Sequence, residues 1–159
     1  MKKQTLRAVT MLISIIALAF VTAVASNAQS SGRKLNAAIP FDFVVGDKAL
    51  AAGEYSIRQI TTNSDSGLAV SSRDGNHKAI RLTKAVSSSK VVRRASLTFR
   101  RYGNTYYLAQ VWIPGATEGR ETLKSKAERS MERELAKSSS KDNLAQNRAE
   151  IVTIVAEVE

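Results

Sequence analysis

Residues 95–113 read ASLTFRRYGNTYYLAQVWI, and this stretch decides the fold because it predicts a β-hairpin with the densest apolar surface of the chain. Gly103-Asn104 separates two runs that are rich in β-branched and aromatic residues. A two-residue loop with glycine first is typical of the primed turns that match strand twist. The predicted register pairs Tyr102 with Thr105, Phe99 with Leu108, Leu97 with Gln110 and Ala95 with Trp112.

Side chains alternate along a strand, so this hairpin has two different faces. The face with Leu97, Phe99 and Leu108 is predicted to belong to the core. The opposite face is polar near the turn and apolar at its far end. We expect Val111 and Ile113, at that far end, to lie beneath a C-terminal helix.

The first residues predict an export signal. Lys2, Lys3 and Arg7 precede an uncharged apolar run over residues 8–25, and residues 26–28 supply the small side chains that signal peptidase accepts. We therefore expect a signal peptide at residues 1–28 and a periplasmic or secreted protein. An uncleaved anchor is the alternative, because the run is near the lower limit of a membrane span.

After residue 28 the chain is long enough for one domain, which we predict as a flexible N-terminus (29–34) and a single β-rich domain (35–159). The chain has no cysteine, which excludes disulfides, thiolate nucleophiles and Cys-ligated metals. The formal net charge of +10 falls to +7 when the three signal cations are removed. Such a charge favours anionic partners but says nothing about the fold.

Short β segments separated by turn signals make up most of the remaining sequence. Strands are predicted at residues 35–43, 54–60, 68–71, 78–83 and 151–158, and the first hairpin arm is expected to begin at residues 90–92. Pro40 marks the first strand as an edge strand or a bulged one. The pattern predicts a mainly β fold, either an antiparallel β-sandwich or a small barrel of about seven strands.

A different pattern follows Pro114-Gly115. Residues 122–137 lack glycine and proline and predict one amphipathic helix. Its apolar stripe recurs every four residues, at Leu123, Ala127, Met131 and Leu135. A polar connector then leads to the final strand.

Three segments together resemble a known family. They are residues 39–47 (IPFDFVVGD), 52–57 (AGEYSI) and 99–120 (FRRYGNTYYLAQVWIPGATEGR). The combination is similar to a family of small exported proteins common in acidobacterial genomes, and the similarity runs over most of the chain after the signal. It implies export and a shared fold, but no activity. Where that family often has proline, this chain has Ala51, so the turn should be less rigid.

Catalytic patterns are weak. His77 is the only histidine, and with Asp74 it flanks a predicted tight turn where a solvated side chain is the ordinary outcome. No G-x-S-x-G nucleophile motif is present. Asp42, Asp47 and Glu54 match neither glycosidase nor calcium-loop spacing. We therefore expect no enzyme, no cofactor and no metal site.

The hairpin carries the best candidates for ligand or partner contact, because arginine beside tyrosine binds phosphate, sulfate or uronate groups. These candidates are Arg94, Arg100, Arg101, Tyr102, Tyr106, Tyr107 and Trp112. The simpler interpretation, that the arginines solubilise a sheet edge, is favoured. The cationic helix is not expected to rest on a membrane, because its acids at Glu121, Glu128, Glu132 and Glu134 offset the charge.

The sequence thus predicts an exported non-enzymatic β-domain that acts as a structural or interaction module. Candidate partners are anionic envelope polymers or another envelope protein, with no nucleic acid and no stable membrane insertion after signal cleavage. The alternative is a small-ligand-binding, lipocalin-like barrel with a lumen lined by Tyr55, Phe99, Leu108 and Trp112.

Overall fold

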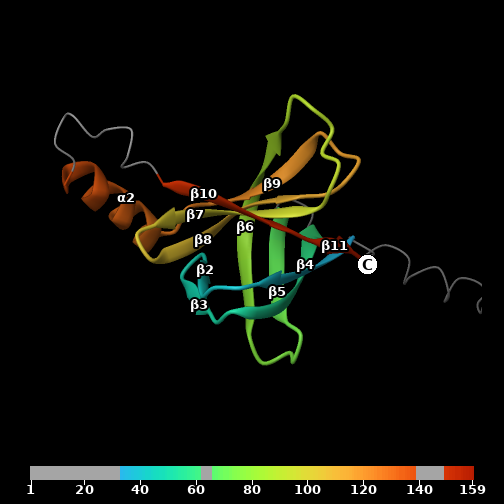
Figure 1. Ribbon diagram of the computed structural model, residues 1–159, viewed down its shortest axis with the longest axis horizontal. Helices are drawn as coiled ribbons and strands as arrows, with labels where there is room; N and C mark the ends of the chain where they lie inside the picture. Colours follow the sequence, from blue (N-terminus) through green and yellow to red (C-terminus); the bar gives the residue numbers. More distant parts are fainter. Residues whose placement is uncertain (1–32, 62–65, 139–148) are drawn as a thin grey trace, which may run out of the picture. The chain divides into compact units, whose positions relative to one another are not determined.

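The computed structural model describes residues 33–61, 66–138 and 149–159, which are mainly β with one helix among them (Figure 1). The strands are β1 (Lys34–Ile39), β2 (Phe43–Val45), β3 (Lys48–Leu50), β4 (Gly53–Thr61), β5 (Ser66–Ser72), β6 (Lys78–Ser87), β7 (Ser96–Tyr102), β8 (Thr105–Trp112), β9 (Glu118–Thr122), β10 (Glu150–Val155) and β11 (Glu157–Val158), and the helix is α2 (Lys126–Ser138). The mainly β class, the C-terminal helix and the final β segment are confirmed. The predicted signal peptide and most of the predicted connector lie outside the described residues.

The strands form one mixed sheet whose two ends belong to the same piece of chain. The order along the sheet is β10-β7-β8-β9-β6-β5-β4-β1-β11, and every neighbouring pair is antiparallel. Outside this path, β2 pairs antiparallel with β3 and parallel with β8. Only Ala156 separates β10 from β11, so the C-terminal segment pairs with β7 through one half and with β1 through the other.

The turn of the β7–β8 hairpin is the predicted one. Gly103 has a φ of 59°, the left-handed conformation that a primed turn requires. Tyr102 pairs with Thr105, and Phe99 pairs with Leu108, as the sequence predicts. The loop residues therefore fix the register of the part of the hairpin next to the turn.

Farther from the turn, a β-bulge shifts that register by one residue. Leu97 pairs with Val111 rather than with the predicted Gln110. Because alternation is strict, the shift turns Val111 and Ile113 onto the core face. The prediction that these two side chains lie beneath the helix is therefore wrong.

At the bulge Ala109 has no opposite residue on β7, because Thr98 pairs with Gln110 and Phe99 pairs with Leu108. The hydroxyl of Thr122 donates to the carbonyl oxygens of Leu108, at 2.5 Å, and Ala109, at 3.2 Å. Thr122 is buried at the end of β9. Its hydroxyl thus donates to β8 at the bulge.

Aromatic rings fill the centre of the core. Phe43, Tyr55 and Phe99 are all buried, and Phe43 meets the other two edge to face at centroid distances of 4.9 and 5.6 Å. The alternative of a lipocalin-like barrel places Tyr55, Phe99 and Leu108 around an open lumen. These three side chains are instead packed in the core. The remaining core consists mainly of inward-facing aliphatic side chains: Leu35, Ala37, Ile39, Val45, Leu50, Ile57, Leu68, Val70, Ala79, Ala95, Leu97, Val111 and Ala156.

Helix α2 begins at Lys126 instead of the predicted residue 122. Glu118–Thr122 forms β9, which pairs with both β6 and β8. Thr122, the first residue of the predicted helix, is thereby held in a strand, and Ser125 caps the helix that follows. As a result only Met131 and Leu135 of the predicted apolar stripe are half-buried, while Leu123 and Ala127 are exposed.

Two further boundaries differ from the predictions. Residues 90–92 are not a strand, because Val92 bonds instead to the loop at Gly115 and Ala116. Lys34, predicted to be in the flexible N-terminus, belongs to β1. The described residues contain eleven strands rather than about seven, because β2, β3 and β9 are short segments that pattern alone does not separate.

Candidate functional site

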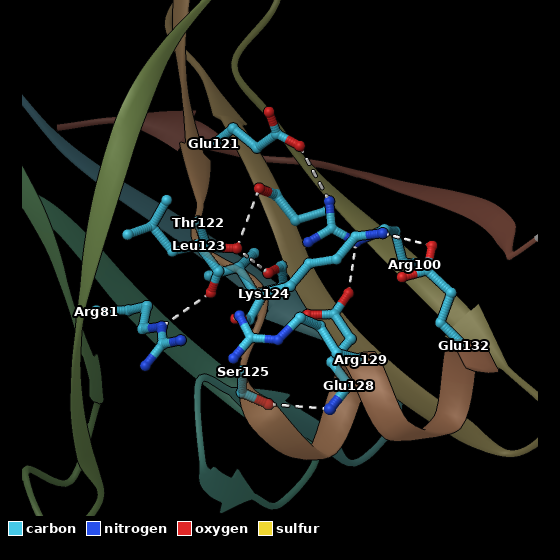
Figure 2. Close-up of polar contacts among 12 residues, drawn as sticks. Arg81, Arg100, Glu121, Thr122, Leu123, Lys124, Ser125, Glu128, Arg129 and Glu132 are labelled. Atoms are coloured by element: carbon cyan, nitrogen blue, oxygen red, sulfur yellow. Dashed lines mark hydrogen bonds and ion pairs between the residues drawn. The ribbon is translucent and has the colours of Figure 1, made fainter. Parts of the chain in front are cut away.

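The most elaborate polar cluster among the described residues joins α2 to the β7–β8 hairpin (Figure 2). Phe99 faces the core, so its neighbour Arg100 faces the opposite side of β7, where α2 packs. The Arg100 Nε donates to Glu128 Oε1 at 2.6 Å, and its Nη1 donates to Glu121 Oε1 at 3.2 Å. Glu121 also meets the Lys84 ammonium at 3.2 Å. Two cations and two carboxylates therefore balance across four elements, β6, β7, β9 and α2.

The helix begins at a side-chain cap. The Ser125 hydroxyl accepts a hydrogen bond from the Glu128 N–H at 3.1 Å, and the Ser125 carbonyl accepts one from the Arg129 N–H at 3.1 Å. Ser125-x-x-Glu128 has the sequence of a capping box, in which the glutamate normally reaches back to the cap residue. Here the carboxylate turns to Arg100 instead. This motif was the sequence signal that would have located the start of the helix.

Two tyrosines complete the cluster. Tyr102 and Tyr107 are buried and meet edge to face, with centroids 5.8 Å apart and planes at 73°. Burial, followed by the charge of Glu128, raises the pKa of Tyr102 to about 12. The same two causes raise the pKa of Tyr107. The Tyr102 hydroxyl makes no hydrogen bond of good geometry to the described residues. The negative charge of the nearby Glu128 carboxylate nevertheless acts on it.

Arg101 and Tyr106 lie on the other face of the hairpin. The Arg101 guanidinium sits 5.4 Å from the Tyr106 ring centroid and donates to Glu150 at 3.0 Å. Tyr106 stacks on Phe41 with a centroid distance of 3.9 Å. This pair ties β10 and the β1–β2 connection to the hairpin, rather than forming an open binding face.

The last two predicted contact residues stand apart. Arg94 is exposed before β7 begins. Trp112 pairs with Gly119 across β8 and β9, and its Nε1 donates to Gln110 at 3.1 Å. The seven predicted contact residues are thus divided among separate locations, and Arg100, Tyr102 and Tyr107 are buried. A partner would have to displace α2 to reach those three.

The acidic residues considered for catalysis or calcium binding do not converge. The Asp42 carboxylate accepts from the Ala52 N–H, Asp47 pairs with Arg81, and Glu54 pairs with Arg73. Within the described ranges no group of three or more histidine, aspartate or glutamate side chains is arranged to hold a metal ion.

His77 and Asp74 belong to the exposed turn between β5 and β6. The Asp74 carboxylate accepts hydrogen bonds from the Ser72 hydroxyl and from the Asn76 N–H and side chain. The Ser72 bond is the main reason why the pKa of Asp74 lies below its usual value. Asp74 thus organises a turn, as the simpler interpretation of the sequence has it.

The outward side of α2 carries a row of cations. With 3.6 residues per turn, they fall within an arc of about 80° over a length of about 16 Å. The four side chains, all exposed, are Lys126, Arg129, Arg133 and Lys137. We call this row the basic face of α2.

The acids predicted to offset these cations are mostly turned away from them. Glu121 lies in β9 and not in the helix, and Glu128 is buried against Arg100. Glu132 pairs with Lys124, which precedes the helix. Glu134 alone has no ion pair among the described residues, and it lies on a flank of the helix. Glu132 thus offsets Lys124 as predicted, whereas none of the four cations of the basic face forms an ion pair with a described residue.

No protein-family model, curated protein or solved structure matches this chain. Among the described residues, no helix has both the length and the apolar character needed to cross a membrane. The function is therefore argued from the arrangement of its own side chains.

Proposed function

We propose that this chain is an exported, non-enzymatic interaction module that binds an anionic polysaccharide along the basic face of α2. The observation that carries the proposal is the burial of Glu128 against Arg100. Glu128 is 2 % exposed, so its carboxylate faces the sheet and not the outer surface of the helix. One ion pair thus seats the helix and leaves its outer side cationic.

The cations of the basic face are oriented but not neutralised. Arg129 Nη1 donates to the Lys124 carbonyl at 2.9 Å, and Arg133 Nε donates to the Arg129 carbonyl at 3.2 Å. A carbonyl oxygen holds a guanidinium in place while leaving its full charge available. A planar guanidinium then offers two parallel donors to a carboxylate or a sulfate.

A linear polymer fits this face better than a membrane does. The half-buried apolar residues of α2, Met131 and Leu135, are on the side away from the cations, and the helix contains no aromatic residue. An interfacial helix needs an apolar face free to enter lipid. Export, expected from residues 1–28 and from the family resemblance, argues for an envelope polymer over nucleic acid.

We also propose that the sheet closes on itself as a small barrel instead of stacking as a sandwich. The support is that β10 and β11, at the two ends of the strand order, flank the single residue Ala156, whose N–H donates to the Ala95 carbonyl at 2.9 Å. Hydrogen exchange at this amide provides the test: a closed sheet protects it as strongly as the central strands, whereas an open edge exchanges early.

The polysaccharide proposal is tested by removing the four charges of the basic face. The variant K126Q/R129Q/R133Q/K137Q is compared with R58Q/K78Q/K90Q/R93Q, which removes four exposed cations elsewhere and gives the same net charge. Binding to heparin, as a sulfated probe, is measured by calorimetry at several salt concentrations. Exposed ion pairs contribute about 0.2–1 kcal/mol each, so the helix variant should bind about tenfold to a hundredfold more weakly.

The control variant should lose much less affinity, and both variants should keep the wild-type circular dichroism spectrum. Equal losses in the two variants would show that net charge alone attracts the polymer, which contradicts the proposal. Binding to phosphatidylglycerol vesicles that exceeds heparin binding and depends on the same four residues would identify a lipid surface instead.

A further inference from the structure

A small cavity lies at the end of the core away from the aromatic rings. Its volume is about 140 Å³, and its walls are formed by inward-facing side chains near the ends of β1, β4, β5 and β8. The apolar walls are Leu35, Ile57, Leu68, Val111 and Ile113. The buried rings of Phe43, Tyr55 and Phe99 pack against one another elsewhere in the core and do not line this cavity. The cavity is therefore a small, partly enclosed space with both aliphatic and polar walls.

The polar residues of this cavity gather on one side. They are Arg33, Gln59, Glu118 and Arg120. Arg120 pairs with Val111 across β8 and β9, so it lies on the inward face of the sheet. Arg33 donates to the Pro114 carbonyl at 3.5 Å, which leaves its charge uncompensated.

Arg120 is half-buried and held by a neutral group. With the Gln59 amide oriented so that its oxygen faces the guanidinium, that oxygen accepts from Arg120 Nε at 3.1 Å and from Nη2 at 3.0 Å. Arg120 makes no ion pair with any described residue, although Glu118 lines the same cavity. A partly desolvated guanidinium that is paired only with a neutral amide gains more from a carboxylate, because the two parallel hydrogen bonds then join opposite charges.

We propose that this cavity binds a compact apolar monocarboxylate, with the carboxylate on Arg120 and the apolar body between the aliphatic walls. The volume sets the size of the ligand: a dry apolar cavity of about 150 Å³ accepts a single benzene ring. Two arginines and one glutamate give the polar side of the cavity one net positive charge, which favours a ligand with one negative charge. A volume of about 140 Å³ is too small for the whole body of a long-chain fatty acid.

This site is independent of the basic face of α2. Its walls come from β1, β4, β5, β8 and β9, and no residue of the helix contributes to it. A packed domain needs neither a residual cavity nor an inward arginine at this position, whereas a binding pocket combines apolar walls with a few placed polar groups.

Benzoate is the probe. It is titrated into the full chain by calorimetry, while the methyl signals of Val111 and Leu68 are followed by NMR. We expect saturable binding that shifts these methyl groups and weakens at least about tenfold in R120Q, because a charge-assisted contact is worth about 1.5–3 kcal/mol. The matched control K48Q removes one exposed charge from β3, outside the cavity, and should bind as the wild type does.

Benzyl alcohol, a neutral ligand of similar size to benzoate, distinguishes the contribution of the apolar walls from that of Arg120. Benzyl alcohol should bind wild type and R120Q with the same affinity, since it has no charge to offer the guanidinium. The proposal is overturned if benzoate fails to shift the Val111 and Leu68 methyls of the folded wild type, or if R120Q binds it as tightly as K48Q does. Because R120Q shortens the side chain and removes the two guanidinium donors to Gln59, its folding is checked by the unfolding midpoint.

Discussion

Arg100 Nε and Glu128 Oε1, 28 residues apart in sequence, meet at 2.6 Å between the outer face of β7 and the first turn of α2. Their side chains are only 10 % and 3 % exposed, so water screens the pair very little. Burying both charges costs much of what their attraction returns, and such pairs specify position better than they add stability. The pair therefore determines where on the sheet the helix docks.

Breaking this pair by removing one partner should be costly. In R100M the Glu128 carboxylate stays buried without its cation, and we expect the free energy of unfolding to fall by about 3–5 kcal/mol, measured by urea denaturation. The double variant R100M/E128L removes both charges and should recover most of that loss. Glu121 keeps Lys84 as a partner in both variants, so it does not confuse the comparison. A loss below about 1 kcal/mol in R100M would show that the helix moves off the sheet without penalty.

The stability of the domain should fall at high pH because of Tyr102. Its pKa rises from the unfolded value of 10.0 to about 12 in the folded chain, so the folded state holds the phenol proton more tightly. The resulting stabilisation is complete below pH 10 and is lost as the pH rises through about 12. Unfolding midpoints measured across this interval should decrease less steeply in Y102F than in wild type.

Some pH dependence should persist in Y102F, because Tyr55 and Tyr107 also have raised pKa values that arise first from burial. Tyr106 provides the matched control, since it is half-buried and stacked on Phe41. If Y106F flattens the alkaline profile as much as Y102F does, Tyr102 is not the responsible group.

Thr122 should be important for the bulge in β8. T122V keeps the shape of the side chain but removes the donor to the carbonyls of Leu108 and Ala109. An unsatisfied buried acceptor costs about 1–3 kcal/mol, so we expect a loss of that size in the free energy of unfolding. T98V changes the same side chain on β7, where no side-chain hydrogen bond is formed, and should cost less than about 0.5 kcal/mol. Equal losses in T122V and T98V would mean that the change in unfolding free energy reflects the β-propensity of the side chain and not the hydrogen bonds at the bulge.

The hairpin shows how far the sequence determines this fold. Gly103-Asn104 and the alternation around Phe99 fix the turn and the nearest pairs, and these were predictable because the signals are local. The bulge was not predictable, since Ala109 resembles any other small strand residue and its carbonyl is satisfied by Thr122, thirteen positions away.

The candidate site shows the same limit. Arg100 and Tyr107 lie opposite each other on one face of the hairpin, but their burial depends on where α2 docks. The helix start was misplaced because residues 122–125 contain neither glycine nor proline, whereas Thr122 is held in β9 by pairing with β6 and Ser125 caps the helix. Likewise, Arg120 is brought to the cavity through pairing with Val111, a consequence of long-range register that no local pattern contains.

The contact between Gly119 and Trp112 should tolerate no side chain. A methyl group at Gly119 would lie 2.6 Å from Cε3 of Trp112, so the indole must move or the two strands must separate. We expect G119A to lower the free energy of unfolding by about 1–3 kcal/mol. Trp112 is the only tryptophan, so its emission spectrum reports the displacement directly. In a W112L background the same glycine substitution should cost much less, because the smaller side chain leaves room for the methyl group. An unchanged emission spectrum together with an unchanged unfolding midpoint in G119A would show that the ring does not cover the glycine in solution.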